Sequence, residues 1–157
     1  LPIVETAAGV WNVLEIASSP KVCRLAFGAL DLQLDAGIAG EGEELLYARS
    51  RIVLASRVAG IVPPLDGVTT ALDDADALAS DVRRARRLGF GGKLCIHPKQ
   101  VGAINGGFHP TESEVAWARR VLEAASSSGE GASRLDGRMI DRPVVEWARS
   151  VVRMVDG

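Results

Sequence analysis

Cysteine and aromatic residues are scarce in this chain. It has two cysteines, and aromatic side chains make up 4% of its 157 residues. Cys23 and Cys95 fit no zinc-binding pattern in number or separation. Because each lies in a short apolar run, we expect two reduced thiols buried in strands, where free cysteine is common. The tryptophans Trp11, Trp117 and Trp147 fall at core-facing positions of helical patterns, and we expect them to pack.

A strong net charge and long apolar runs are also lacking. The formal net charge is −2, and 47% of the residues are hydrophobic. This composition argues against the basic face of a nucleic-acid-binding protein and against disorder. No apolar run approaches the roughly 18 residues of a membrane helix, and the first ten residues resemble no secretory signal. We therefore expect a domain with a sizeable core, no nucleic-acid or membrane partner and, by default, a cytoplasmic location.

Short apolar runs alternate with helical patterns along the first two thirds of the chain. Helices are expected over residues 8–17, 43–58 and 73–88, and strands over residues 2–5, 23–27, 60–62 and 93–96. Pro63 and Pro64 are expected to end the third strand, and Gly89 to end the third helix. This alternation is typical of parallel β/α units.

The pattern changes after His97. Thr111 and Glu114 form the capping box of a helix expected to end near residue 125. A serine- and glycine-rich linker is predicted over residues 126–132. We therefore divide the chain into a β/α domain, residues 1–110, and a helical C-terminal extension, residues 111–157.

Within this extension, Asp136 and Gly137 predict a tight turn. Pro143 suits the first turn of a last amphipathic helix. Asp141 stands just before that helix, where its simplest role is that of N-cap.

Four strands leave two architectures open. One is a small open α/β domain. The other is half of a (β/α)₈ barrel, since a complete barrel needs eight strands and about 250 residues. Both place functional groups at the carboxyl ends of the strands.

Two acidic residues follow the first two expected strands. Glu5 ends the first strand, and Asp31 comes shortly after the second. Carboxylates from neighbouring strands can bind a hard cation such as Mg²⁺, which accepts few protein ligands and fills its other positions with water and substrate oxygens. The alternative is that both residues stabilise the start of the helix that follows.

Three other features could bind a ligand. Gly28 permits a close approach of the backbone, and the amides of Ala29, Leu30 and Asp31 could stabilise an anion, although glycines after strands are also ordinary turns. His97 ends the fourth strand and could act as acid, base or positioning group, or have a structural role.

Other chemistry is not indicated. We expect Lys93 to extend its ammonium group outward from the strand region. The sequence has no phosphate-binding loop, dinucleotide fingerprint or Ser-His-Asp triad motif.

Four sequence blocks together resemble the citrate lyase β-subunit branch of the HpcH/HpaI aldolase family, which includes the malyl-CoA lyases. They are PIVETAAGVWNVLEIA, RLAFGALDLQLDAG, LGFGGKLCIHPKQV and LDGRMIDRPVVEWA, at residues 2–17, 24–37, 88–101 and 135–148. Their order and spacing extend the resemblance over nearly the whole chain, and the IHP and MID motifs are its most specific parts.

The resemblance implies a Mg²⁺-dependent carbon–carbon lyase that cleaves a hydroxyacyl thioester of the citryl-CoA or malyl-CoA type by retro-aldol or retro-Claisen chemistry. Glu5 and Asp31 would hold Mg²⁺, which binds a 2-oxo acid or the hydroxyacyl group. Gly28, Ala29 and Leu30 would contribute to substrate binding. The acyl group stays open, as does the carrier, which is either free CoA or an acyl-carrier protein.

The resemblance also implies that this chain is the C-terminal half of a TIM barrel, strands five to eight, followed by a helical tail. Asp141 would be a catalytic residue donated to a neighbouring subunit of a homo-oligomer, expected to be a trimer. His97 would lie near the thioester or pantetheine arm. The missing half would supply a substrate-binding arginine, so this chain alone would lack a complete site.

Two alternatives to the lyase stay open. One is a malyl-CoA thioesterase or malate synthase-like activity at the same metal site. The other is a non-catalytic half-barrel that binds CoA or a partner chain.

Overall fold

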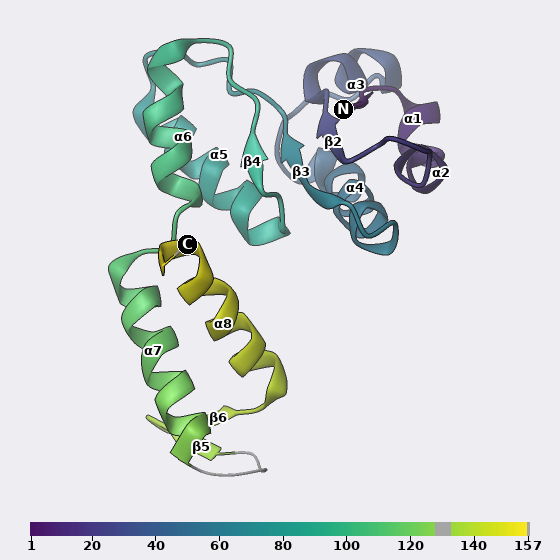
Figure 1. The fold of residues 1–157 in the computed structure, drawn as a ribbon. Coiled ribbons are helices and arrows are strands. Elements are labelled where there is room, and N and C mark those ends of the chain that lie inside the picture. Colours follow the sequence, from purple (N-terminus) through teal and green to yellow (C-terminus); the bar gives the residue numbers. More distant parts are fainter. Residues whose placement is uncertain (128–132, 157) are drawn as a thin grey trace. The chain divides into compact units, whose positions relative to one another are not determined.

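The chain forms two compact units, Leu1–Phe108 and His109–Gly157, in a computed structural model that describes residues 1–127 and 133–156 (Figure 1). The division follows Phe108, near the boundary expected after residue 110. Among the helices described, none is long and apolar enough to cross a membrane.

Four parallel strands form the sheet of the first unit, in the order β1-β2-β3-β4. Val4 pairs with Phe27, Ala26 with Leu65, and Asp66 with Lys93. The strands are β1 Ile3–Val4, β2 Arg24–Phe27, β3 Val62–Asp66 and β4 Gly92–Lys93. The expected parallel β/α alternation is confirmed, and the carboxyl ends of all four strands meet at one edge of the sheet.

Helices follow each of these strands and cover one face of the sheet. They are α1 Ala7–Trp11, α2 Val13–Ala17, α3 Ala29–Ala36, α4 Leu46–Val58, α5 Ala75–Leu88 and α6 Val101–Phe108, with short 3₁₀ helices η1 Glu43–Leu45 and η2 Pro98–Gln100. Asp74 caps α5 by accepting a hydrogen bond from the Ala77 amide at 2.9 Å. Gly89, with φ of +99°, ends α5 in the left-handed conformation, as expected.

The main core lies between the sheet and these helices. Val4, Leu25 and Phe27 of the strands pack with Leu45 and Ile52 from the α4 region. Because side chains alternate along a strand, Ile3 projects from the other face of β1, where it is 53% exposed. This part of the chain therefore buries one face of its sheet better than the other.

The prolines do not end the third strand, contrary to the sequence prediction. β3 runs through Pro63 and Pro64 to Asp66. A proline lacks an amide donor but keeps its carbonyl acceptor: Pro63 O accepts from Arg24 Nε at 2.7 Å, and Pro64 O accepts from the Gly91 amide at 2.9 Å. The register between β2 and β3 shifts at this point, which accommodates the missing donors.

The cysteines and two of the tryptophans are more exposed than expected. Cys23 and Cys95 are free and exposed, because the strands are shorter than the apolar runs and leave both residues outside them. Trp11 is 72% exposed and Trp147 is 39% exposed. Trp117, by contrast, packs against the core of the second unit.

The second unit is a helical hairpin with a small two-stranded sheet. Its elements are α7 Glu112–Ser127, β5 Ser133–Leu135, β6 Arg138–Ile140 and α8 Arg142–Asp156. Asp136 and Gly137 have φ values of +50° and +76°, which suits a type I′ turn between the antiparallel strands and confirms the predicted turn. The core of this unit contains Ala118, Val121, Ile140, Ala148 and Val151.

The predicted capping box of α7 is also confirmed. The Thr111 hydroxyl accepts from the Glu114 amide at 3.2 Å, and the Glu114 carboxylate accepts from the Thr111 amide at 2.7 Å. Of the predicted linker, Ser126 and Ser127 belong to α7, and residues 128–132 lie outside the described residues.

Candidate metal and substrate site

Glu5 follows β1 but does not cap the helix after it. Thr6 is the cap of α1, since its hydroxyl accepts a hydrogen bond from the Gly9 amide at 3.0 Å. The capping interpretation of Glu5 is therefore wrong. The Glu5 side chain instead lies across Gly28, where an added Cβ would be 2.4 Å from Glu5 Cβ and 2.9 Å from its Oε2. A glycine at position 28 is required for this arrangement.

Asp31 lies in the first turn of α3 and is exposed. The N-cap residue of α3 is Gly28, which has no side chain to satisfy the first amides. A carboxylate in a first helical turn is electrostatically favoured. This position is compatible with both interpretations of Asp31, helix stabilisation and metal binding.

The two carboxylates come from adjacent parallel strands. Glu5 directly follows Val4, which pairs with Phe27, and Asp31 comes four residues after Phe27. Neither carboxylate forms an ion pair or accepts a hydrogen bond within residues 1–127 and 133–156. Two unpartnered carboxylates at the same sheet edge suit a hard divalent cation.

No larger ligand set is present in the described residues. Among them, no group of three or more His, Cys, Asp or Glu side chains could hold a metal ion. A cation at Glu5 and Asp31 would therefore take its other ligands from water, from substrate or from protein outside this chain. Mg²⁺ fits this donor set, because it usually binds one or two carboxylates and keeps several waters.

Amides at the start of α3 lie beside these carboxylates in the sequence. The N–H groups of Ala29, Leu30 and Asp31 belong to the first turn, where amides have no carbonyl partner within the helix. Gly67, just after β3, packs against this turn, since an added Cβ would be 2.8 Å from Ala29 Cβ. The geometry can therefore present amide donors to an anion such as a carboxylate.

His97 follows β4 and caps the short helix η2. Its Nδ1 accepts a hydrogen bond from the Lys99 amide at 3.1 Å. The structural interpretation of His97 is thus confirmed. In the neutral imidazole this hydrogen bond assigns the proton to Nε2, so His97 retains one donor for a ligand.

Asp141 lies in the second unit. Its Oδ1 accepts from the Val144 amide at 3.3 Å, and its carbonyl accepts from the Val145 amide at the start of α8. The N-cap interpretation of Asp141 is confirmed. The side chain is exposed in this unit.

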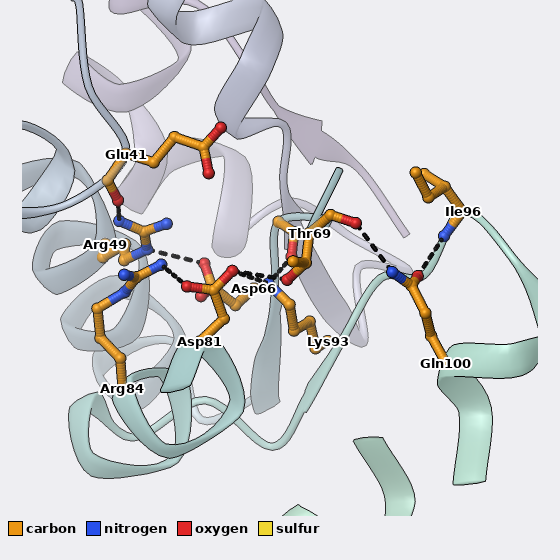
Figure 2. A network of polar contacts seen from close by, with 10 residues as sticks. Glu41, Arg49, Asp66, Thr69, Asp81, Arg84, Lys93, Ile96 and Gln100 are labelled. Atoms are coloured by element: carbon orange, nitrogen blue, oxygen red, sulfur yellow. Dashed lines mark hydrogen bonds and ion pairs between the residues drawn. The ribbon is translucent and has the colours of Figure 1, made fainter. Parts of the chain in front are cut away.

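A buried ion pair missed by the sequence interpretation lies at the carboxyl end of β3 (Figure 2). Arg49 Nε of α4 is 3.0 Å from Asp66 Oδ1, and the Asp66 side chain is 0% exposed. Arg49 Nη1 also donates to Glu41 O at 2.9 Å. Asp66 Oδ2 has no hydrogen-bond partner among the described residues. Asp66 is the last residue of β3 and ends an apolar run of the sequence, and that signal could have identified it.

Lys93 does not point outward, contrary to the sequence prediction. Its buried ammonium group donates to Gly67 O and lies 3.8 Å from Asp81 Oδ2. Burial lowers the pKa of Lys93, while the Asp66 and Asp81 carboxylates act in the opposite direction. Asp81 also accepts from Thr69 Oγ1 at 2.6 Å, so it connects α5 to the loop after β3.

Comparison with known proteins identifies the family of this chain. The sequence model of the HpcH/HpaI aldolase/citrate lyase family matches residues 1–98. The chain belongs to this family. The match includes Glu5, Asp31 and His97, and the resemblance noted from the sequence is confirmed.

Relatives of this HpcH/HpaI chain include a citrate lyase subunit beta-like protein and a malyl-CoA lyase. A citrate lyase subunit beta-like protein of Deinococcus radiodurans is 44% identical, over 97% of this chain and 56% of its own length. The L-malyl-CoA/beta-methylmalyl-CoA lyase of Cereibacter sphaeroides is 35% identical, over 98% and 55%. The chain therefore spans about half the length of the curated relatives it matches.

A solved structure has the same fold over almost the whole chain. The CitE protein of Mycobacterium tuberculosis, in complex with magnesium, acetoacetate and coenzyme A, aligns with a TM-score of 0.89 at 33% identity. The alignment covers 99% of this chain and 60% of that one. The α/β fold with four parallel strands thus matches part of a citrate lyase β-like structure.

Proposed function

We propose that this chain is the metal-binding half of a Mg²⁺-dependent carbon–carbon lyase that cleaves a hydroxyacyl thioester of the citryl-CoA or malyl-CoA type. The observation that carries the proposal is the pair of unpartnered carboxylates, Glu5 and Asp31, at the carboxyl ends of adjacent parallel strands. Relatives named as citrate lyase β subunits and malyl-CoA lyases support it.

The first unit corresponds, in this proposal, to strands five to eight of a (β/α)₈ barrel. Three features support this placement: the strands are parallel and in sequential order, β1 and β4 are open edges, and Ile3 projects from the less covered face. This chain covers 56% of the length of its Deinococcus radiodurans relative, which leaves room for four further β/α units in a full-length protein. Those units would close the sheet and complete the site.

Each site residue then has a defined task. Glu5 and Asp31 hold Mg²⁺, which when bound supplies a Lewis acid and a template for the substrate oxygens. The amides of Ala29, Leu30 and Asp31 orient a substrate carboxylate. His97 donates from Nε2 toward the thioester or its pantetheine arm and thereby fixes the position of the cleaved bond.

Asp141 is the proposed acid–base residue, donated by the C-terminal unit to a neighbouring copy in a homotrimer. A carboxylate that transfers a proton at the reacting carbon or at water would also determine whether cleavage, thioester hydrolysis or the reverse condensation dominates. The malyl-CoA thioesterase and malate synthase-like alternatives therefore share this residue.

Thioester cleavage tests the proposed activity. A panel of citryl-, malyl-, methylmalyl- and citramalyl-CoA would be assayed with Mg²⁺ and with EDTA, on residues 1–157 and on the full-length protein. We expect activity only in the full-length, Mg²⁺-loaded protein. Folded full-length protein that binds Mg²⁺ but cleaves none of these esters would favour the alternative of a non-catalytic half-barrel that binds CoA or a partner chain.

Asp141→Asn is expected to lower the rate of cleavage by about a hundredfold or more without changing Mg²⁺ affinity. Asparagine is as good an N-cap as aspartate, so the variant removes the charge but keeps the cap of α8. Turnover and Mg²⁺ titration of the full-length variant are the measurements.

Mixed oligomers test whether Asp141 acts across a subunit interface. Asp141→Asn and Asp31→Ala chains, each strongly impaired alone, are expected to regain activity when unfolded together and reassembled, because some sites then combine two intact residues. Reassembled mixed oligomers without any regained activity would contradict donation between subunits.

A further inference from the structure

We propose that Gln100, assisted by Lys93, is a positioning residue that fixes the His97 turn to the loop after β3. The inference goes beyond the proposed site, because neither residue belongs to the metal or substrate ligands. The structural part of the inference does not depend on the proposed function. Only the expected effect on the kinetics rests on that function. The structural part concerns two loops at the carboxyl edge of the sheet (Figure 2).

Gln100 joins these two loops by its side chain. It is the last residue of η2, and it is 1% exposed. Its Nε2 donates to Thr69 O at 2.9 Å, and its Oε1 accepts from the Ile96 amide at 3.1 Å. A carboxamide can serve both contacts, because it has a donor and an acceptor on one group.

Lys93 makes a second attachment to the same loop. The β3–β4 ladder ends with the Leu94 amide donating to Asp66 O at 2.9 Å. Beyond that point side chains continue the pairing: Lys93 Nζ donates to Gly67 O, and Gln100 Nε2 donates to Thr69 O. Two carbonyls of the loop after β3, those of Gly67 and Thr69, thus accept hydrogen bonds from Lys93 in β4 and from Gln100 in η2.

This loop contacts both proposed ligand-binding regions of the first unit. Gly67 packs against Ala29 at the start of α3. At the other side, the Ile96 amide held by Gln100 immediately precedes His97, and the Gln100 amide donates to His97 O at 3.0 Å. The Gln100 carboxamide therefore fixes the backbone just before His97, while the Lys99 amide holds the imidazole itself.

Substitutions of Gln100 separate its two contacts. Gln100→Met removes donor and acceptor at similar size. Gln100→Glu keeps an acceptor for the Ile96 amide but, when ionised, has no donor for Thr69 O. Ser56→Ala is the matched control, because Ser56 is also buried and also donates to a carbonyl, that of Ile52 within α4, but lies away from these loops.

Hydrogen exchange in the ligand-free full-length protein tests the structural part without any assay of activity. In Gln100→Met the Ile96 amide is expected to exchange about tenfold faster, because its acceptor is lost. In Gln100→Glu this amide stays protected. Unchanged exchange at Ile96 in folded Gln100→Met would overturn the proposal, whether or not the protein proves to be a lyase.

Steady-state kinetics test the positioning role. Both Gln100 variants are expected to raise KM for the thioester about tenfold while the Mg²⁺ requirement stays unchanged, with Gln100→Met the more affected. Ser56→Ala is expected to leave KM unchanged. A uniform loss of kcat at unaltered KM in the Gln100 variants would indicate a purely structural role and would also overturn the proposal.

Discussion

Replacing Glu5 by glutamine, or Asp31 by asparagine, is expected to lower Mg²⁺-dependent thioester cleavage by about a thousandfold or more. A bound divalent cation contributes several kcal/mol of transition-state stabilisation, and each 1.4 kcal/mol, roughly, corresponds to a factor of ten in rate. Both substitutions keep the size of the side chain, so the packing of residue 5 across Gly28 is retained. Turnover of the full-length protein across a Mg²⁺ titration is the measurement.

Glu15→Gln is the matched control for these variants. Glu15 is an exposed glutamate in the first turn of α2, so its substitution removes one negative charge of the same unit without changing the proposed ligands. We expect normal activity and normal Mg²⁺ affinity for this control. Normal turnover by Glu5→Gln or by Asp31→Asn would show that the metal ligands lie elsewhere.

Arg49→Met is expected to destabilise the protein by about 3–5 kcal/mol. The substitution leaves the fully buried Asp66 carboxylate without its cation and removes the donor to Glu41 O. It also removes the guanidinium group 5.4 Å from the centre of the Phe27 ring. Equilibrium unfolding of the full-length variant by urea gives the free energy of unfolding directly.

Two further variants test whether the loss comes from an unpaired buried charge. The double variant Arg49→Met, Asp66→Leu is expected to recover most of the stability, because it leaves no charge unpaired at this position. Arg149→Ala breaks the exposed pair with Glu146, 2.7 Å long, and should change stability by less than about 1 kcal/mol. A single Arg49→Met variant as stable as wild type would contradict the assigned role of the pair.

The features predicted correctly from the sequence depend on neighbours close in the chain. Thr111 and Glu114 are three residues apart, and their reciprocal hydrogen bonds formed as expected. Gly89 adopts the left-handed conformation that ends α5. In both cases the residue types and their spacing in the sequence are enough to determine the local structure.

The features that were missed depend on contacts distant in the chain. Lys93 is buried because Gly67 O, 26 residues earlier, accepts its hydrogen bond, and because Asp81 lies near it. Nothing in the sequence around Lys93 specifies these partners. The prediction that Pro63 and Pro64 end the strand is wrong for the same reason, because their carbonyls accept hydrogen bonds from the distant residues Arg24 and Gly91.

The candidate site was only partly accessible from the sequence. The rule that polar groups gather at the carboxyl ends of parallel strands identified Glu5 and Asp31, but it could not exclude helix capping by Glu5. That exclusion required the observed contact of Thr6 with the Gly9 amide. The roles assigned to these residues and to Asp141 remain predictions, with the experiments given above as their tests.

The order of the strands has a consequence for protein engineering. The strands β1, β2, β3 and β4 lie side by side in their sequence order. Every strand pair of this sheet is therefore formed within one continuous segment of the chain. A complementary set of strands could therefore be supplied as a separate polypeptide without interrupting any of these pairings. Residues 1–108, which contain all four strands, can thus be expressed as one fragment, and recovered function on mixing with the rest of the full-length protein would report their association.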